Sequence, residues 1–227
     1  MSVTVTPIKM IRQLPEMLAK NFTYLLYGAT PHEALVIDPT WEMQKLEMEL
    51  AARHLNLKAI LVTHGHQDHT NLVQPLVKRY GCDVWMAEAD IQAFSFSCDN
   101  LHPIAAEAPF FAAGTLVKPW LTPGHTMGCV SYQIDDNFFT GDTLFIEGCG
   151  MCFGKGSDPR LLFHSLQRMK ANLPLFTKIF PAHSYGHPPG KEFSFVMQNN
   201  VYLSFDAEDA FVSYRMREGQ TRLFDFK

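Results

Sequence analysis

Three histidines and one aspartate stand close together in a single short stretch of the chain. In LVTHGHQDHT, residues 61–70, they are His64, His66, Asp68 and His69. Imidazole nitrogens and carboxylate oxygens are the ligands that zinc, iron and manganese take in proteins. Four such groups are more than one metal would take from a single short loop, so we expect two metals. Further ligands should then come from other parts of the chain.

Three later positions offer such ligands. They are His125 in TPGHT, Asp142 in FTGDT and His183 in FPAHS. Each stands just after an apolar stretch that is typical of a β-strand, as AILV at 59–62 is for the first cluster. Loops at strand ends carry chemistry on a rigid scaffold, so we expect the four loops to meet at one edge of the fold.

The elements that would position these loops alternate between strand and helix patterns. Strands are predicted at 3–10, 22–28, 33–39, 59–62, 83–90 and 177–183, and a hairpin at 128–135 and 137–145. Helices are predicted over 41–55 with Thr40 as a cap, over 70–81, and from Asp158-Pro159 to about 171. Residues 95–116 have the pattern of an irregular loop. Strands followed by a helix in each half predict a layered α/β sandwich.

Size and composition exclude several classes of protein. The 227 residues, 47% of them hydrophobic, predict one domain over 1–227, with 192–227 as a short aromatic C-terminal extension. A net charge of −4 argues against a nucleic-acid-binding protein. No signal-peptide pattern and no membrane-spanning apolar run is present. The five cysteines are scattered, which favours the reducing cytoplasm.

The run His64-Gly65-His66-Gln67-Asp68-His69 resembles the HxHxDH signature of the metallo-β-lactamase-fold hydrolases, and the later ligands match in order and spacing. The resemblance covers roughly residues 3–190. It implies an αββα sandwich with two divalent metals, usually zinc, with iron or manganese as alternatives. It also implies a role for each ligand: His64, His66 and His125 on one metal, Asp68, His69 and His183 on the other, and Asp142 with a hydroxide between them.

The same resemblance assigns further roles. Asp38, in VIDP, would orient a ligand loop, as metal-bound histidines require. Asp68 and Asp142 would be the catalytic carboxylates. The β-lactamase branch usually has a cysteine ligand, and here no cysteine stands at a ligand position, which argues against lactam hydrolysis.

The run TGDTLFIEGCG, residues 140–150, is similar to the corresponding run of glyoxalase II and of persulfide dioxygenases. Glyoxalase II has a lysine and a tyrosine that contact glutathione where this chain has Met151 and Phe153. Tyr185 matches a tyrosine of that family that contacts substrate. The resemblance therefore implies a thioester hydrolase, using hydroxide, whose carrier is not glutathione.

Coenzyme A and acyl carrier proteins also carry thioesters, on a pantetheine arm. Residues 155–191 contain six lysines and arginines against a single aspartate, Asp158, and this basic segment could attract an acidic acyl carrier protein. The whole chain is similar to the zinc-dependent hydrolases encoded with polyketide assembly lines.

Three alternatives remain open at this stage. One is a glutathione thioester hydrolase of the glyoxalase II type. Another is an iron-dependent persulfide dioxygenase that uses His64, His125 and Asp142 as a two-histidine, one-carboxylate face. The third is a non-catalytic binding module, against which the complete set of ligands argues.

Overall fold

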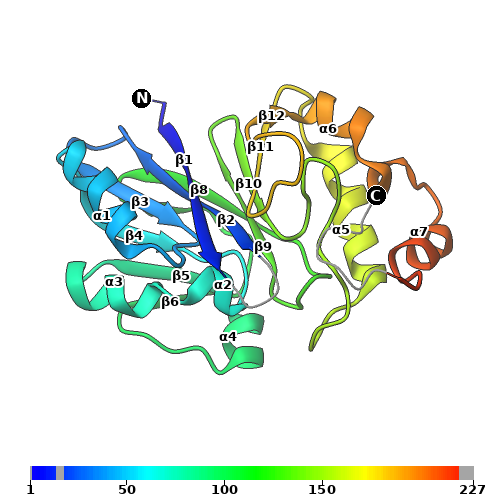
Figure 1. The fold of residues 1–227 in the computed structure, drawn as a ribbon, viewed down its shortest axis with the longest axis horizontal. Coiled ribbons are helices and arrows are strands. Elements are labelled where there is room, and N and C mark those ends of the chain that lie inside the picture. The colour runs from blue at the N-terminus through cyan, green and yellow to red at the C-terminus, as the bar shows by residue number, and fades with distance from the viewer. Residues whose placement is uncertain (1, 14–17, 220–227) are drawn as a thin grey trace.

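Two six-stranded sheets pack face to face, with helices on the outer side of each (Figure 1). The computed structural model describes residues 2–13 and 18–219. One sheet has the strand order β1-β2-β3-β4-β5-β6, and the other has the order β12-β11-β10-β9-β8-β7. The αββα sandwich expected from the sequence is thus confirmed. Among the described helices, none is long and apolar enough to cross a membrane.

The first sheet is built from the N-terminal half of the chain. Its strands are β1 Thr4–Gln13, β2 Leu18–Tyr27, β3 Glu33–Ile37, β4 Asn56–Leu61, β5 Asp83–Ala87 and β6 Leu101–Ile104. The connecting helices are α1 Met43–Ala52, α2 Gln67–Thr70, α3 Val73–Tyr80 and α4 Glu88–Phe94. From β3 to β6 the strands run parallel, so their carboxyl ends all reach the same edge.

The second sheet comes from the C-terminal half. Its strands are β7 Phe110–Ala112, β8 Thr115–Leu121, β9 Val130–Ile134, β10 Asn137–Gly141, β11 Lys178–Pro181 and β12 Lys191–Glu192. The helices are α5 Pro159–Asn172, α6 Phe193–Asn199 and α7 Glu208–Arg215, with a 3₁₀ turn at Val201–Ser204. The predicted hairpin of β9 and β10 is confirmed.

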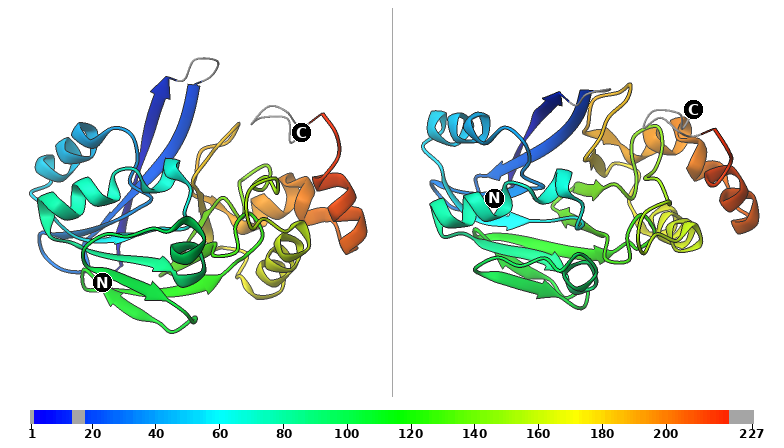
Figure 2. Two further views of the ribbon diagram at one scale, coloured as in Figure 1. Left: turned by 90° about the horizontal axis from the view of Figure 1, so that it is seen from below. Right: turned by 60° about the horizontal axis from the view of Figure 1, so that its bottom comes forward.

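Three apolar cores correspond to the three interfaces of this sandwich. In β3, Leu35 and Ile37 face the second sheet, whereas Ala34 and Val36 face the helices on the other side. Because both faces of such a strand are buried, its sequence is a continuous apolar run. The third core joins the second sheet to α5, α6 and α7, which lie on the side away from the first sheet (Figure 2).

Several local predictions were wrong. Residues 95–116 contain the edge strands β6 and β7, which pair with β5 and β8. Strand β5 ends at Ala87, and residues 88–90 begin α4. Thr40 does not cap α1: its hydroxyl accepts a hydrogen bond from Asn71 at 2.6 Å. The helix predicted over 70–81 begins later, at Val73 of α3, and Gly81 ends it in a left-handed conformation as predicted.

The C-terminal segment is more structured than the short aromatic extension that the sequence predicts. Helix α6 and the 3₁₀ turn come before α7, and Phe193, Tyr202 and Phe211 are fully buried against the apolar residues of α5. The described part of the segment, residues 192–219, is therefore integral to the third core.

Candidate metal centre

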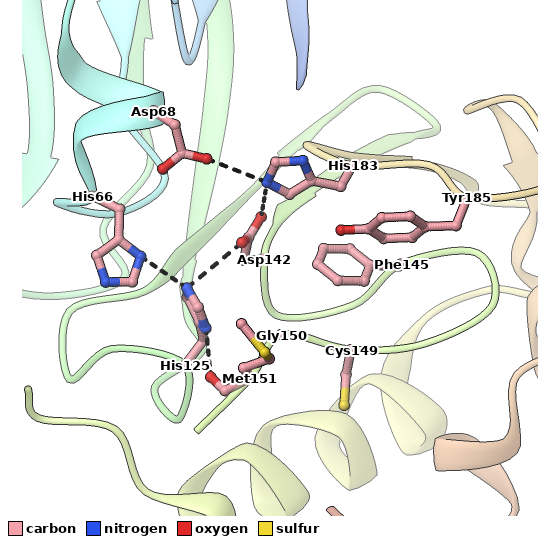
Figure 3. A pocket seen from close by; sticks show the side chains of 10 residues that line it. All are labelled: His66, Asp68, His125, Asp142, Phe145, Cys149, Gly150, Met151, His183 and Tyr185. Atoms are coloured by element: carbon pink, nitrogen blue, oxygen red, sulfur yellow. Dashed lines mark hydrogen bonds and ion pairs between the residues drawn. The ribbon is translucent and has the colours of Figure 1, made fainter. Parts of the chain in front are cut away.

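The ligand-bearing loops all follow strands and meet at one edge of the two sheets. His64, His66, Asp68 and His69 follow β4, His125 follows β8, Asp142 follows β10 and His183 follows β11. The carboxyl ends of β4, β8, β10 and β11 bring these loops to one cavity (Figure 3). Five of the candidate ligands line it: His66, Asp68, His125, Asp142 and His183. The structure confirms that the four loops converge, as predicted.

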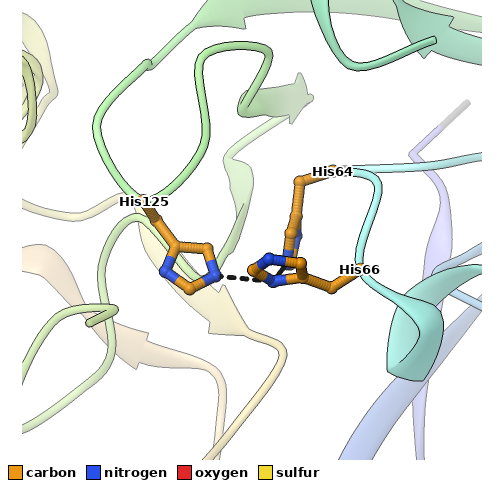
Figure 4. A group of neighbouring side chains, drawn as sticks. All are labelled: His64, His66 and His125. Atoms are coloured by element: carbon orange, nitrogen blue, oxygen red, sulfur yellow. Dashed lines mark hydrogen bonds between the residues drawn. The ribbon is translucent and has the colours of Figure 1, made fainter. Parts of the chain in front are cut away.

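Three imidazoles form the first cluster (Figure 4). Nδ1 of His66 lies 3.0 Å from Nε2 of His64 and 3.0 Å from Nε2 of His125. The rings stand nearly perpendicular to one another, with interplanar angles of 81–85°. Three nitrogens therefore point at a common centre.

A second cluster joins one carboxylate to two imidazoles. Oδ2 of Asp68 lies 3.5 Å from Nε2 of His69 and 3.5 Å from Nε2 of His183. Asp142 lies between the clusters: its Oδ1 is 3.6 Å from Nε2 of His69, and its Oδ2 is 3.5 Å from Nε2 of His125. The two oxygens of one carboxylate thus face different clusters.

These spacings suit bound cations. Ligands at about 2.1 Å in a tetrahedral zinc site lie about 3.4 Å from one another. Nε2 of His69 and Oδ1 of Asp142 are buried and have no hydrogen-bond partner among the described residues. Buried polar atoms normally have partners, so two such atoms aimed at one point fit a metal ion.

Most of the rings are held from behind by their other nitrogen. Nδ1 of His125 is 2.7 Å from the carbonyl oxygen of Met151, and Nδ1 of His183 is 2.8 Å from that of Lys20. Each of these rings donates through Nδ1 and presents an unprotonated Nε2 to the cluster. His69 is held in the same way by Asp38, at 2.9 Å.

Asp38 has the surroundings of a residue that orients a ligand loop. Its Oδ2 accepts hydrogen bonds from His69 and from the hydroxyl of Thr63, and its Oδ1 accepts from the backbone N–H of Thr63. Thr63 immediately precedes His64. One buried carboxylate therefore holds both ends of the first ligand loop.

The protein groups alone give the two clusters different charge. Burial lowers the pKa of His64 and of His125, which keeps both rings neutral. Burial would also lower the pKa of His69, but the surrounding carboxylates, Asp68 foremost, raise it to about 10. Burial would raise the pKa of Asp68, but His69 and His183 hold it below its ordinary value. Asp68 thus stays ionised, and the carboxylates of the second cluster favour a positive charge between them.

The cavity beside the clusters has a volume of about 150 Å³ and a partly apolar wall. Phe145, Met151 and Tyr185 line it, and the Tyr185 hydroxyl points toward the metal ligands in Figure 3. Phe153 is not among the lining residues: it is 56% exposed, and its ring lies 5.9 Å from the guanidinium of Arg215.

Gly150 shows how tightly the loop after Asp142 packs against the site. A Cβ at this position would lie 2.2 Å from the carbonyl oxygen of Asp142 and 2.7 Å from Nδ1 of His125. Only glycine fits such a close approach of backbone to ligand. The loop can therefore bring the Met151 carbonyl to the His125 ring.

Sequence reasoning missed two buried polar residues near the clusters, Asn21 on β2 and Asp90 on α4. The amide of Asn21 donates to Oδ2 and to the carbonyl oxygen of Asp68, both at 3.0 Å, while Asn21 Oδ1 accepts from the indole N–H of Trp41. Nothing in a single sequence distinguishes this asparagine, although a polar residue directly before the strand-like run 22–28 is a weak signal.

Half of the lysines and arginines in the basic segment 155–191 form ion pairs with acidic residues elsewhere in the fold. Arg160 pairs with Glu208 and Asp209, Arg168 with Glu107, and Lys170 with Asp206 at 2.9 Å. All four acidic residues lie outside the segment. The net positive charge of residues 155–191 therefore does not produce an equally basic surface.

Comparison with known proteins agrees with this geometry. The family profile described as the metallo-beta-lactamase superfamily matches residues 20–183, a range that contains all seven proposed ligands. The chain belongs to the metallo-β-lactamase superfamily. Its histidine and aspartate clusters lie where the loops of that fold converge.

Individual members of the superfamily are similar over most of the chain. BaeB of Bacillus velezensis, described as a probable polyketide biosynthesis zinc-dependent hydrolase, is 40% identical over 91% of this chain and 92% of its own length. A hydroxyacylglutathione hydrolase of Methylobacillus flagellatus is 41% identical over 73% of this chain and 62% of its own length. The crystal structure of TTHA1623 in a di-iron-bound form is 27% identical, with a TM-score of 0.71 over 87% of this chain and all of that one.

Proposed function

We propose that this protein is a metal-dependent hydrolase of acyl thioesters that works with two divalent cations. The observation that carries the proposal is the position of Asp142, whose two carboxylate oxygens each face a different cluster at the floor of the cavity. The di-iron form of the related TTHA1623 structure supports a second cation. Zinc is the proposed metal, as in the name of BaeB.

The proposed ligands divide as the clusters do. His64, His66 and His125 would hold one cation, and Asp68, His69 and His183 the other. Asp142 would bridge them. When bound, such cations supply Lewis acidity and a water of lowered pKa.

Thioester cleavage suits a site in which the described cavity wall offers few proton donors. Water adds to the acyl carbon, the C–S bond breaks, and the sulfur leaves as a thiolate. A thiol has a pKa of about 8.5, so this leaving group needs little help from an acid. Burial, with the nearby Asp142 and Asp68, raises the pKa of Tyr185, so its hydroxyl stays protonated and serves as a donor to bound substrate.

We further propose that the acyl group arrives on the pantetheine arm of an acyl carrier protein. The description of BaeB supports a substrate from polyketide biosynthesis. Met151, which lines the cavity, offers no cation to a glutathione carboxylate. Because half of the basic segment is paired, we place carrier docking near Lys155, whose neighbour Gly154 lies close to the His66 ring.

A persulfide dioxygenase reaction would need only His64, His125 and Asp142 on one iron. That reaction would leave the Asp68, His69 and His183 cluster without a role, although its ligand atoms are equally well placed. The complete second cluster therefore favours the hydrolase.

The test presents one acyl group on three carriers: an acyl carrier protein, coenzyme A and glutathione. We expect kcat/KM on the carrier protein to exceed that on glutathione at least tenfold, which corresponds to about 1.4 kcal/mol. Met151→Lys serves as the matched variant and should raise turnover on the glutathione thioester alone. Faster wild-type turnover on glutathione would contradict the proposed carrier, and oxygen uptake with a persulfide would contradict the proposed reaction.

A further inference from the structure

Asp90 is a fully buried carboxylate on helix α4, an element that carries none of the proposed metal ligands. Its Oδ2 accepts hydrogen bonds from the backbone N–H of Gly65 at 2.7 Å and from the hydroxyl of Thr126 at 2.8 Å. Its Oδ1 accepts from the backbone N–H of Gly128 at 2.7 Å. One carboxylate thus accepts three short hydrogen bonds.

The three donors belong to two different ligand loops. Gly65 lies between His64 and His66, whereas Thr126 directly follows His125. These loops come from different sheets, yet together they form the three-histidine cluster. Asp90 therefore accepts hydrogen bonds from both ligand loops of that cluster but belongs to neither loop.

Helix α4 also approaches both loops too closely for ordinary residues. A Cβ at Gly128 would lie 2.4 Å from the backbone nitrogen of Asp90, and a Cβ at Gly65 would lie 2.2 Å from the ring of Phe94. The Phe94 ring in turn packs edge-on against His66, with ring centroids 5.4 Å apart. Two glycines thus permit α4 to pack directly on the loops.

The chemistry of the carboxylate explains why this position is acidic. Among residues 2–13 and 18–219, no cation forms an ion pair with Asp90, so three uncharged donors hold a buried charge. Burying a charge is costly unless hydrogen bonds compensate it. An ionised carboxylate only accepts, whereas an asparagine would turn an N–H₂ group toward one of the loops. Simple packing would not need a charge at this position.

We propose that Asp90 is a positioning residue that fixes the His64–His66 loop relative to the His125 loop, and so sets the metal affinity of the three-histidine cluster. The second cluster takes its ligands from Asp68, His69 and His183, whereas the hydrogen bonds of Asp90 within the described ranges go to Gly65, Thr126 and Gly128. Asn21 and Asp38 hydrogen-bond to that cluster, at Asp68 and His69, and Asp38 also reaches the first ligand loop through Thr63. The inference rests on the two-cation site of the proposed function but not on its substrate.

The test is Asp90→Asn in the full chain, with metal content per chain measured after dialysis against a graded series of a chelator. Loss of residues that orient metal ligands typically lowers metal affinity about 10- to 100-fold. We expect one metal to leave at a chelator concentration about 10- to 100-fold lower than in the wild type. The other metal should leave at the wild-type concentration.

Cobalt(II) loading identifies the cluster that is emptied. A bound cobalt shifts the resonances of nearby ring N–H protons in the NMR spectrum. The N–H of His125, held by the Met151 carbonyl, should lose its shift in Asp90→Asn. The N–H protons of His69 and His183, held by Asp38 and Lys20, should keep theirs.

Three further variants separate positioning from general destabilisation. Thr126→Val removes one of the three hydrogen bonds and should reproduce the effect in part, and Thr126→Ser should restore the wild-type response. Leu50→Ala, in the core between the first sheet and its helices, should lower Tm without changing the order of metal loss. Wild-type metal release in Asp90→Asn would overturn the proposal, as would an equal response in Leu50→Ala.

Because no substrate enters this experiment, its outcome is independent of whether the reaction is thioester hydrolysis.

Discussion

Replacement of Asp142 by alanine is expected to lower metal content and catalytic rate together. Its two oxygens face separate clusters, at 3.5–3.6 Å from the ring nitrogens of His125 and His69. Without the carboxylate each cluster keeps three candidate ligands, but the group that would bridge the two proposed cations is gone. A metal ion contributes several kcal/mol of transition-state stabilisation, and each 1.36 kcal/mol is a factor of ten in rate.

We therefore expect Asp142→Ala to lower kcat/KM on its thioester by at least about 100-fold, with fewer than two metals bound per chain. Metal analysis and thiol release would be measured on the same sample. Asp136→Ala is the matched control, because Asp136 is an exposed aspartate in the turn that precedes β10. Full metal content and full rate in Asp142→Ala would refute the site.

Replacement of Asp38 by alanine is expected to cause the largest loss of stability. The substitution leaves three donors, two on Thr63 and one on His69, without their buried acceptor. Breaking a buried charge pair of this kind costs about 3–5 kcal/mol in the free energy of unfolding. For a chain of this length that corresponds to a fall in Tm of about 6–20 °C.

The control for Asp38 is Asp83→Ala, which removes an aspartate that pairs with a histidine at the surface. Asp83 and its partner His102 are each about half exposed, and such pairs contribute about 0–1 kcal/mol. Thermal unfolding followed by circular dichroism compares the two variants. Equal Tm values for the two would show that the Asp38 hydrogen bonds contribute little.

The residues that the structure brings together as candidate metal ligands could be picked out from the sequence, because their signal is local and dense. Four candidate ligands within His64–His69, followed by single candidates after apolar strands, indicate both the site and the edge of the fold on which it lies. The buried strands β3, β4 and β10 could be predicted for a related reason. Both faces are covered along residues 34–37 of β3, 59–61 of β4 and 138–139 of β10, and these residues are all apolar.

Other features depend on pairing in space and leave little trace in the sequence. The edge strands β6 and β7 are short and are paired on one side only, so 95–116 has the composition of a loop. The positioning residues Asn21 and Asp90 are defined by their partners, which lie 47 and 25–38 residues away in the chain. No periodicity distinguishes such residues.

Charge counted along the chain was a poor guide to the surface. The basic segment 155–191 has its counter-charges on Glu107 and on residues 206–209, which the fold brings alongside α5. Docking of an acidic carrier by the whole segment would require those ion pairs to break. This is why the proposed docking point is reduced to the loop around Lys155.

The most direct test of a two-cation thioester hydrolase is a metal titration. Metal-free protein would receive increasing amounts of zinc, and thiol release from an acyl carrier protein thioester would be measured at each step. We expect almost no turnover at first, and a rate that reaches its maximum only at two zinc ions per chain. A full rate without metal, or a maximum at one ion per chain, would contradict the account.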